Sequence, residues 1–392
     1  MKLVEEGKID LDVPVQRYLE SWNIPETEFN IDGVTVRRLL SGTAGMPLGD
    51  IDERYSPATE NIPTLRQTLS RNALLFQEPG SSFSYSNTGF NILELLIEEL
   101  SRRDFSEYME KEILKPLGME RASFQWRDDF SPPVATGYGN GGEALPVYVY
   151  PYNAAGDLFG TLEDIAHFAA AGMTRFAPWH RGVLSSETVE SMYTVEANMS
   201  SYYRFVFDGY GFGHFIEYLE GENSRHKAVS HGGQGAGWMT DFHLIPSTGD
   251  GIVILSNSQR TWPGFAHILS DWAKWNGFVS IGMGAILTVQ KIAWVLITLT
   301  LALLLWQVGE IVEGTIAGSR RLKLSPRPAT ALRWTQLTAA FIFLGAFLGI
   351  QSLEYWFIDS VLPVATNWID FTLLLAAGVL GAGFFLPREE SR

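Results

Sequence analysis

Three uncharged apolar runs near the end of the chain constrain its fold more than any other feature. They follow an abrupt change of composition at Gly277 and cover Ile292–Gly309, Trp334–Leu353 and Phe371–Pro387. A helix of about 20 apolar residues spans the hydrocarbon core of a bilayer, which is about 30 Å thick. Helices buried in a soluble core are the alternative, but almost no amphipathic segment accompanies these runs to cover them. The sequence therefore predicts a membrane domain at 292–387 with three transmembrane helices.

The loops between these runs predict an orientation. The first loop, Glu310–Arg333, carries five basic residues, whereas the second, Glu354–Asp370, carries none. Because basic loops stay on the cytoplasmic side, we expect the first loop and the tail at 388–392 in the cytoplasm. Residues 1–276 would then lie on the extracytoplasmic side, and 277–291 would form an interfacial linker. The predicted localisation is the cell membrane, as a multi-pass protein with the lipid bilayer as a partner.

The composition of the remaining chain excludes several functions. The formal net charge is −15, and the excess acidic residues lie before Gly277. An acidic domain argues against nucleic acid as a partner, since binding it needs a basic face. The absence of cysteine rules out disulfides and thiol chemistry. The seven histidines are scattered without the spacing of a zinc site, so we expect neither a metal nor a cofactor.

The segment Phe76–Met119 organises the domain at 1–276. A turn at Pro79-Gly80 leads to Tyr85-Ser86-Asn87, and a helix is predicted from Asn91 onward. Its apolar positions recur at helical spacing, and the acidic side chains of Glu94, Glu98 and Glu99 are expected on the opposite face. Taken alone, Tyr-x-Asn also fits a simple capped helix start.

Four stretches of the chain, taken together and in their order along the sequence, are more specific than the Tyr-x-Asn tripeptide alone. They are GVTVRRLLSGTAGMP at Gly33–Pro47, EPGSSFSYSN around Tyr85, AAGDLFGTLEDIAHF at Ala154–Phe168, and HGGQGAGW at His231–Trp238. Together they resemble the serine β-lactamase and penicillin-binding-protein-like hydrolases, in particular the class C-related branch with its esterases and D-amino-acid peptidases. One departure is Gly42, which stands where that family usually has histidine. The resemblance does not cover the membrane part.

The resemblance implies an α+β fold, with an antiparallel sheet flanked by helices and an all-helical lobe. Met1–Val13 resembles the end of the family's helix that begins with the catalytic Ser-x-x-Lys. We therefore expect a truncated chain that lacks its nucleophilic serine and the N-terminal strands, which would leave one sheet edge unpaired. The one Ser-x-x-Lys present, Ser224–Lys227, leads into a predicted strand, and a pattern with two fixed positions occurs easily by chance.

The resemblance also assigns roles to residues of the second and third motifs. Tyr85 would be the catalytic base, and the amide of Asn87 would bind the substrate carbonyl. His231 stands where a lysine of the third motif is usual, on what is expected to be an edge strand. Gly232 and Gly233 would let substrate backbone approach, and the N–H of Gln234 would be an oxyanion donor.

Plainer interpretations of these residues remain open. Tyr85 could be an ordinary loop aromatic, and His231 a strand histidine in a hairpin. Asp157 and Asp164 fit helix caps or flanks better than catalysis.

The sequence thus predicts a membrane-anchored serine hydrolase acting through an acyl-enzyme on a small-molecule or peptide substrate. The bond would be an amide or ester of a peptidoglycan peptide, a D-amino-acid peptide, a β-lactam or a small ester. The chain as given would be inactive without its serine. The alternative is a pseudoenzyme, a membrane-anchored binding or sensor module. The sequence does not indicate an oligomeric state.

Overall fold

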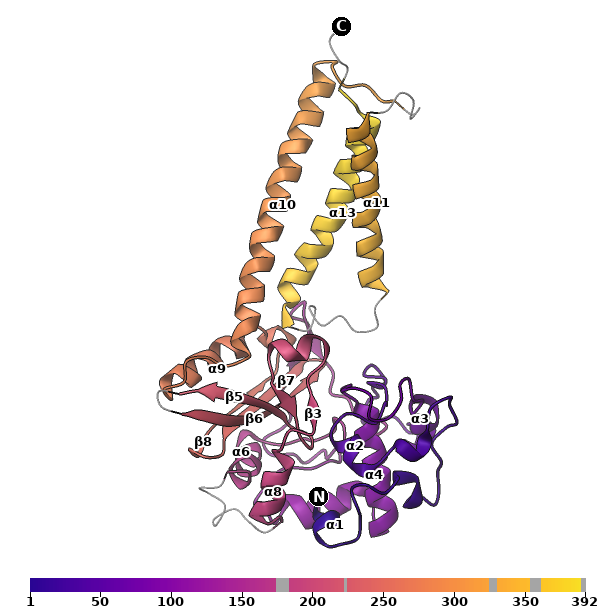
Figure 1. The fold of residues 1–392 in the computed structure, drawn as a ribbon, viewed down its shortest axis with the longest axis vertical. Coiled ribbons are helices and arrows are strands. Elements are labelled where there is room, and N and C mark those ends of the chain that lie inside the picture. Colours follow the sequence, from indigo (N-terminus) through magenta and orange to yellow (C-terminus); the bar gives the residue numbers. More distant parts are fainter. Residues whose placement is uncertain (174–182, 222–223, 324–329, 353–360, 389–392) are drawn as a thin grey trace. The chain divides into compact units, whose positions relative to one another are not determined.

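The computed structural model describes most of the chain, and the described residues are 1–173, 183–221, 224–323, 330–352 and 361–388. They form two compact units, Met1–Thr261 with His267–Ala285, and Trp262–Ala266 with Ile286–Arg392. Figure 1 shows the elements of both.

The first half of the first unit is a helical lobe. Its helices are α1 (Lys2–Glu5), α2 (Val36–Leu40), α3 (Leu65–Asn72), α4 (Asn87–Ser101) and α5 (Phe105–Met109), the last continued by a π-helical turn at Glu110–Leu114. Threonine and serine side chains cap several of their N-termini, as at Thr35, Thr64 and Ser86. Ile92, Leu95 and Leu96 place the apolar face of α4 in the core of this lobe, where each is almost fully buried.

The helix is buried more widely than its sequence pattern indicates. Glu94 and Glu99, which we expected on the polar face of α4, are 1% and 6% exposed. For Glu99 the prediction was wrong, because this residue follows Leu95 by four positions and Leu96 by three and so shares their apolar face. Glu94 does lie on the opposite face, but a loop covers that face, and loops supply hydrogen-bond donors to both carboxylates. The backbone N–H groups of Glu20 and Ser21 donate to Glu99, and the Asn153 loop covers Glu94.

The second half contains an antiparallel six-stranded sheet with the strands in sequence order. The strands are β3 (Ala197–Asn198), β4 (Gly209–Tyr210), β5 (Phe215–Glu220), β6 (Arg225–Gly235), β7 (Trp238–Ile245) and β8 (Asp250–Ser256). Two short strands, β1 (Gly137–Tyr138) and β2 (Ala144–Leu145), pair separately. An antiparallel sheet with flanking helices and a helical lobe is the α+β arrangement that the sequence predicts. Within the described residues β8 pairs only with β7, so its outer edge is open.

Helices cover both faces of this sheet. Successive residues of a strand point to opposite faces. On β7, Leu244 packs with Ala169 and Met173 at the end of α6 (Leu162–Ala171). The neighbouring His243 lies 5.8 Å, ring to ring, from Trp272 of α9 (Gly264–Trp275). Helix α8 (Ser186–Met192) precedes the sheet in the chain.

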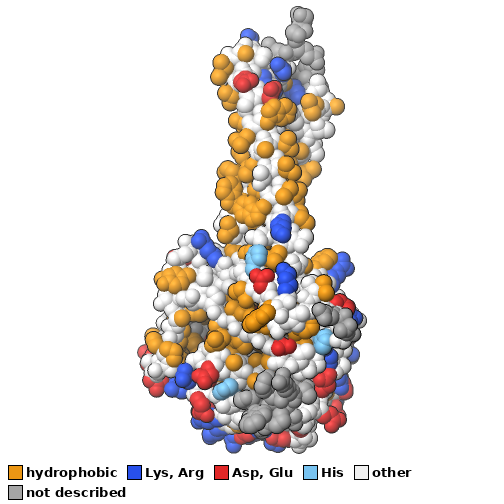
Figure 2. All heavy atoms as spheres, turned by 90° about the vertical axis from the view of Figure 1, so that its left-hand side faces the viewer, with side chains coloured by type: hydrophobic (Ala, Val, Ile, Leu, Met, Phe, Trp, Pro, Cys, Tyr) orange, Lys and Arg blue, Asp and Glu red, His pale blue; other side chains and the backbone are white. Residues whose placement is uncertain are grey.

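The second unit consists of long apolar helices. They are α10 (Gly284–Ile316), α11 (Ala331–Gln351) and α13 (Pro363–Phe385). All three are long and apolar enough to cross a membrane. Figure 2 shows hydrophobic side chains over the face of these helices that it presents. Helix α10 already begins inside the expected linker at 277–291, and Leu353, the end of the second predicted run, lies outside the described residues.

Two basic side chains, one from the loop after α10 and one from the first turn of α11, donate hydrogen bonds to carbonyl groups at the C-terminal end of α13. Arg320 donates to the carbonyl of Leu386 at 2.9 Å, and Arg333 donates to that of Phe384 at 3.0 Å. The last carbonyls of a helix have no partner within it and carry its negative dipole end, so cations stabilise them. The basic residues that predict orientation also satisfy this helix terminus.

Candidate active site

The loop that carries Tyr85 is held by backbone hydrogen bonds to the LLSGTAG segment. The N–H of Ser84 donates to the carbonyl of Gly42 at 2.7 Å, and the N–H of Gly80 donates to that of Thr43 at 2.7 Å. Two of the four family-like stretches are therefore adjacent in space. Together they fix the backbone that leads directly into Tyr85.

Ser86 caps the helix that follows. Its Oγ accepts the N–H of Gly89 at 2.9 Å and donates to the carbonyl of Pro47 at 2.6 Å. Asn87 is the first residue of α4, and its N–H donates to the carbonyl of Leu48 at 3.0 Å. The plain interpretation of this tripeptide as a capped helix start is thus confirmed for Ser86. It does not compete with a functional role, because the cap fixes the residues on either side.

The structure explains why position 42 is occupied by glycine and not by a residue with a side chain. Its φ of +65° lies in the left-handed region, and a Cβ there would stand 2.8 Å from the ring of Phe83. A side chain would disturb the loop one residue before Ser84. Gly42 therefore positions Tyr85 through the backbone.

Replacing Gly42 by Ala is expected to lower the unfolding free energy by about 2–4 kcal/mol, from backbone strain and overpacking together. The matched control is Gly7→Ala. Gly7 has a φ of +70°, but a Cβ at this position would have no atom within 4 Å, so only the backbone strain of about 1 kcal/mol is expected. Thermal unfolding of both variants measures the difference, and equal losses would contradict the role of the Phe83 contact.

Tyr85 meets His231 although the two are distant in sequence. The Tyr85 hydroxyl lies 3.4 Å from Nε2 of His231, which is long for a hydrogen bond. Their ring centroids are 5.8 Å apart, and Phe215 stacks on Tyr85 at 6.2 Å. The structure therefore brings together the second and third motifs at one aromatic wall, which consists of the rings of Tyr85, Phe215 and His231.

The strand that carries the third motif is not a simple edge strand. We expected the third motif on an edge, but β6 lies between β5 and β7. The pairing with β5 ends at Ser230, whereas the pairing with β7 continues to Gly235. Within the described part of the chain, residues 231–235 thus have one side without a strand partner, because β6 extends beyond its neighbour.

The direction of the backbone amides follows from one hydrogen bond. The N–H of Gly233 donates to Oγ1 of Thr240 on β7 at 2.9 Å. Because successive amides of a strand point in opposite directions, those of Gly232 and Gln234 point toward the side without a partner. This is the direction that an oxyanion donor at Gln234 requires. Asn87 is near by sequence, but no hydrogen bond between it and His231 is present among the described residues.

The glycines of β6 are needed for close packing. A Cβ at Gly232 would stand 2.9 Å from the carbonyl oxygen of Thr240, and one at Gly233 would stand 2.5 Å from its Oγ1. At Gly235 the obstacle would be the hydroxyl of Tyr148, at 2.6 Å. The turn to β7 uses Gly237 at a φ of +90°. This hairpin therefore leaves a strand edge with few side chains beside Tyr85.

His231 is uncharged at neutral pH. Burial against the aromatic wall and the nearby His214 lower the pKa of His231 to about 4. An ordinary histidine is partly charged at neutral pH. The neutral ring can exchange a hydrogen bond with Tyr85, but it does not supply the positive charge of a lysine.

Ser224 and Lys227 lie away from this place. Ser224 lies 2.6 Å from His226 Nε2, and Lys227 pairs with Glu190 at 2.6 Å. Four residues of strand separate Lys227 from His231, or about 13 Å. This placement agrees with a chance occurrence of the motif.

Sequence reasoning missed the burial of two carboxyl groups, those of Glu94 and Asp157. Glu94 of α4 accepts the backbone N–H groups of Asn153 and Ala154, both at 2.7 Å, and the side-chain amide of Asn153 at 2.9 Å. Burial raises its pKa to about 7. Asp157 accepts the N–H of Tyr150, and burial raises its pKa to about 8. Asp164 forms a capping box with Thr161, as predicted.

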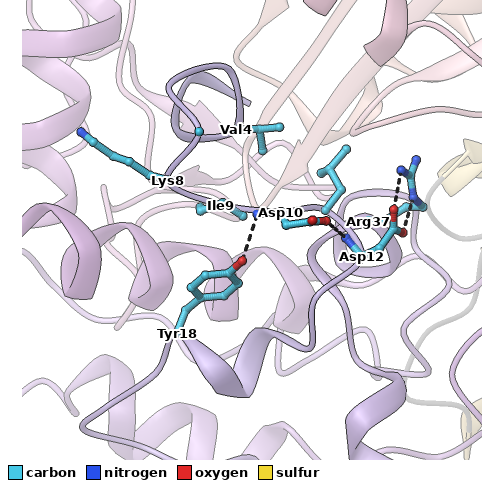
Figure 3. A pocket seen from close by; sticks show the side chains of 9 residues that line it. Val4, Lys8, Ile9, Asp10, Asp12, Tyr18 and Arg37 are labelled. Carbon is cyan, nitrogen blue, oxygen red and sulfur yellow. Dashed lines mark hydrogen bonds and ion pairs between the residues drawn. The ribbon is translucent and has the colours of Figure 1, made fainter.

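A surface hollow of about 480 Å³ lies elsewhere in the lobe (Figure 3). Its rim includes the ion pair of Arg37 with Asp12 at 2.7 Å and the bond from the Asp10 amide to the Tyr18 hydroxyl at 2.9 Å. None of the residues with predicted roles lines it.

Comparison with known proteins supports the family resemblance and the fold. The β-lactamase family model matches residues 1–270. Protein flp of Staphylococcus aureus is 26% identical over 178 residues, which is 43% of this chain and 34% of flp. The penicillin-binding protein homologue of Pyrococcus abyssi superposes with a TM-score of 0.57 at 27% identity, over 72% of this chain and 63% of that one. A structure of SurE with D-Leu superposes with a TM-score of 0.53 at 25% sequence identity, over 69% of this chain and 60% of SurE.

The fold and the matched residues define a β-lactamase-like hydrolase domain. The chain belongs to the β-lactamase family, and it spans about a third of the length of the curated relative flp.

Proposed function

We propose that this protein is a membrane-anchored serine hydrolase whose cleft lies between the Tyr85 loop and the free side of β6. The observation that carries the proposal is the meeting of Tyr85 and His231 beside a glycine-lined strand edge. The reaction would be acyl transfer to a serine followed by hydrolysis. The bond would belong to an amide or an ester.

Each residue then has a defined task. Tyr85 takes the proton of the serine hydroxyl and returns it to the leaving group. The amide of Asn87 and the N–H of Gln234 bind the carbonyl oxygen. His231 exchanges a hydrogen bond with the Tyr85 hydroxyl and fixes its direction. The similarity to SurE, whose structure is known with D-Leu, supports a substrate containing a D-amino acid.

The nucleophile is the incomplete part of this proposal. The sequence contains one Ser-x-x-Lys, at Ser224–Lys227, and its side chains are engaged with His226 and Glu190. We propose that the nucleophilic serine is not among residues 1–392. A second candidate function follows, a binding module that keeps the cleft without the chemistry, and the neutral state of His231 favours it.

Covalent labelling separates these functions. The chain and a form extended by any codons in frame upstream would both be treated with a fluorophosphonate carrying an uncharged fluorophore. The hydrolase proposal expects labelling of the extended form only. Labelling of the chain itself would assign the nucleophile to a serine such as Ser224. If both forms are folded and neither is labelled, the binding module replaces the hydrolase.

The membrane orientation is part of the proposal, with the hydrolase unit outside the cell. Because the chain has no cysteine, single substitutions give a clean test. Ser81→Cys, in an exposed loop of the hydrolase unit, is expected to react with an impermeant maleimide on intact cells. Ala317→Cys, just after α10, is expected to react only after permeabilisation. The reverse pattern would place the hydrolase unit in the cytoplasm.

A further inference from the structure

Three ionisable side chains are buried together on the α9 face of the sheet. Glu217 of β5 is 5% exposed, Asp241 of β7 is 3% exposed, and His243 of β7 is fully buried. Since β6 lies between β5 and β7, these groups flank the strand that carries the cleft edge. They are on the opposite face from His231, whose neighbour Gly232 pairs with Asp241.

In this acidic cluster of Glu217, Asp241 and His243, the charges of Glu217 and His243 offset one another. Oε1 of Glu217 lies 2.9 Å from Nε2 of His243, and Oε2 accepts the N–H of Gly282 at 2.7 Å. Although burial opposes its charge, the carboxylates of Glu217 and Asp241 raise the pKa of His243. Glu217 and His243 thus lie at ion-pair distance without the geometry of a hydrogen bond, and the two groups together carry no net charge when they share one proton.

Asp241 decides the net charge of the cluster. Its Oδ2 would stand 3.2 Å from a Cβ at Gly232, so the carboxyl group fills the space under the cleft strand. Its Oδ1 is buried, and no hydrogen-bond partner for it exists within the described ranges. Burial raises the pKa of Asp241 to about 7. The cluster is therefore uncharged at acid pH and negative at alkaline pH.

Among the residues that the structure describes, the titratable groups that act on Asp241 are His243 and Glu217. On β8 the pairing partner of Asp241 is Ile254, and on β6 it is Gly232. Helix α9 contributes the ring of Trp272, and the chain before α10 contributes the N–H of Gly282. The elements packed around Asp241 therefore add no further charge to the cluster.

The cleft side of β6 provides no compensating cation. His231 is neutral above a pH of about 4. In the part of the chain that the structure describes, no Lys or Arg forms an ion pair or a side-chain hydrogen bond with residues 231–235. A carboxylate bound at the amides of Gly232 and Gln234 would thus face the charge of Asp241 across the backbone of β6, within about two strand spacings, or 10 Å.

We propose that the cleft selects substrates whose reacting end is uncharged, and that Asp241 is the specificity-determining residue that rejects a carboxylate there. The substrate class would be a neutral amide or ester, such as an amidated D-amino-acid peptide, and not a peptide ending in a free carboxylate. This inference rests on the proposed function, because it concerns the ligand of the same cleft.

A matched pair of ligands tests the inference. N-acetyl-D-Ala-D-Ala and its C-terminal amide differ only in the end group, and calorimetry gives the Kd of each for the full chain in zwitterionic nanodiscs. At pH 8 we expect the amide to bind at least about tenfold more tightly, because an unscreened like charge at this distance costs that much or more. At pH 6, where Asp241 is protonated, the two ligands should bind within about threefold of each other.

Substitutions attribute the effect to one residue. Asp241→Asn should remove the preference at pH 8, whereas Glu220→Gln, at the far end of β5 and exposed, should leave it unchanged. If Asp241→Asn does not fold, the pH dependence of the native chain decides instead. A carboxylate that binds as tightly as the amide at pH 8, or a preference that does not depend on pH, would overturn the inference and leave the proposed function standing. If neither ligand binds, the proposed function fails and the inference fails with it.

Discussion

Replacing Tyr85 by Phe is expected to slow acylation by about 10²- to 10⁴-fold in a form of the protein that carries its nucleophile, because the variant cannot take the proton of the serine. The fold should tolerate the change. The ring at position 85 keeps its stacking on Phe215, and the contact that the hydroxyl makes with His231 is long. The measurement is the rate of covalent labelling by a fluorophosphonate, together with the melting temperature of each variant.

Tyr138→Phe is the matched control for this experiment. Tyr138 lies on β1, is 40% exposed and has no role in the proposed cleft. It should label at the native rate. A Tyr85→Phe variant that labels within about threefold of the native rate would show that another group is the base.

Replacing Glu94 by Ala is expected to be the most destabilising single change near the site. It would leave three partly buried donors of Asn153 and Ala154 without an acceptor. A fully buried unsatisfied donor costs about 1–3 kcal/mol, and because these three donors are only partly buried, the unfolding free energy should fall by about 3–6 kcal/mol. The unfolding free energy of Glu94→Gln should lie between those of the native chain and Glu94→Ala. Gln keeps one acceptor oxygen but turns an amide group toward the same donors.

The control is Glu98→Ala, one turn further along α4. Glu98 accepts a backbone N–H from Phe105 at 3.3 Å and is less buried than Glu94. A loss of about 1 kcal/mol is expected in thermal or denaturant unfolding. If both variants lose the same stability, Glu94 is not the anchor of the loop at Asn153.

Much of the fold could be predicted because local chemistry and periodicity agree with it. Ser86 and Thr161 cap the helices that the sequence places after them. The apolar runs near the C-terminus became the three long helices. The meeting of Tyr85 with His231 could be anticipated only through the resemblance to a family, since no local signal links residues so far apart in the chain.

The buried carboxylates could not be predicted for a physical reason. Glu94 lies at a position of α4 that helical periodicity assigns to the polar face, and Asp241 and His243 alternate with apolar residues on β7. Alternation normally places such side chains in water. Here a loop covers Glu94, and α9 covers the polar face of β7. Periodicity indicates which residues share a face, but tertiary packing decides whether that face is exposed.

The extent of the cleft edge also depended on three-dimensional information. The motif at His231–Gly235 was expected on an edge strand, but β6 is internal along its first half. Its second half extends past the end of β5 and so gains a free side. Strand length, which sequence patterns define poorly, therefore produces this free side of β6.

Hydrogen exchange of the full chain with and without N-acetyl-D-Ala-D-Ala amide tests the central claim most directly. The claim is that the Tyr85 loop and the free side of β6 form one ligand-binding cleft. It predicts slower exchange in peptides that contain Gly232–Gly235 and Ser84–Asn87, with little change around the hollow between Val4 and Arg37. Protection confined to that hollow, or no protection at a concentration at which calorimetry detects binding, would contradict it.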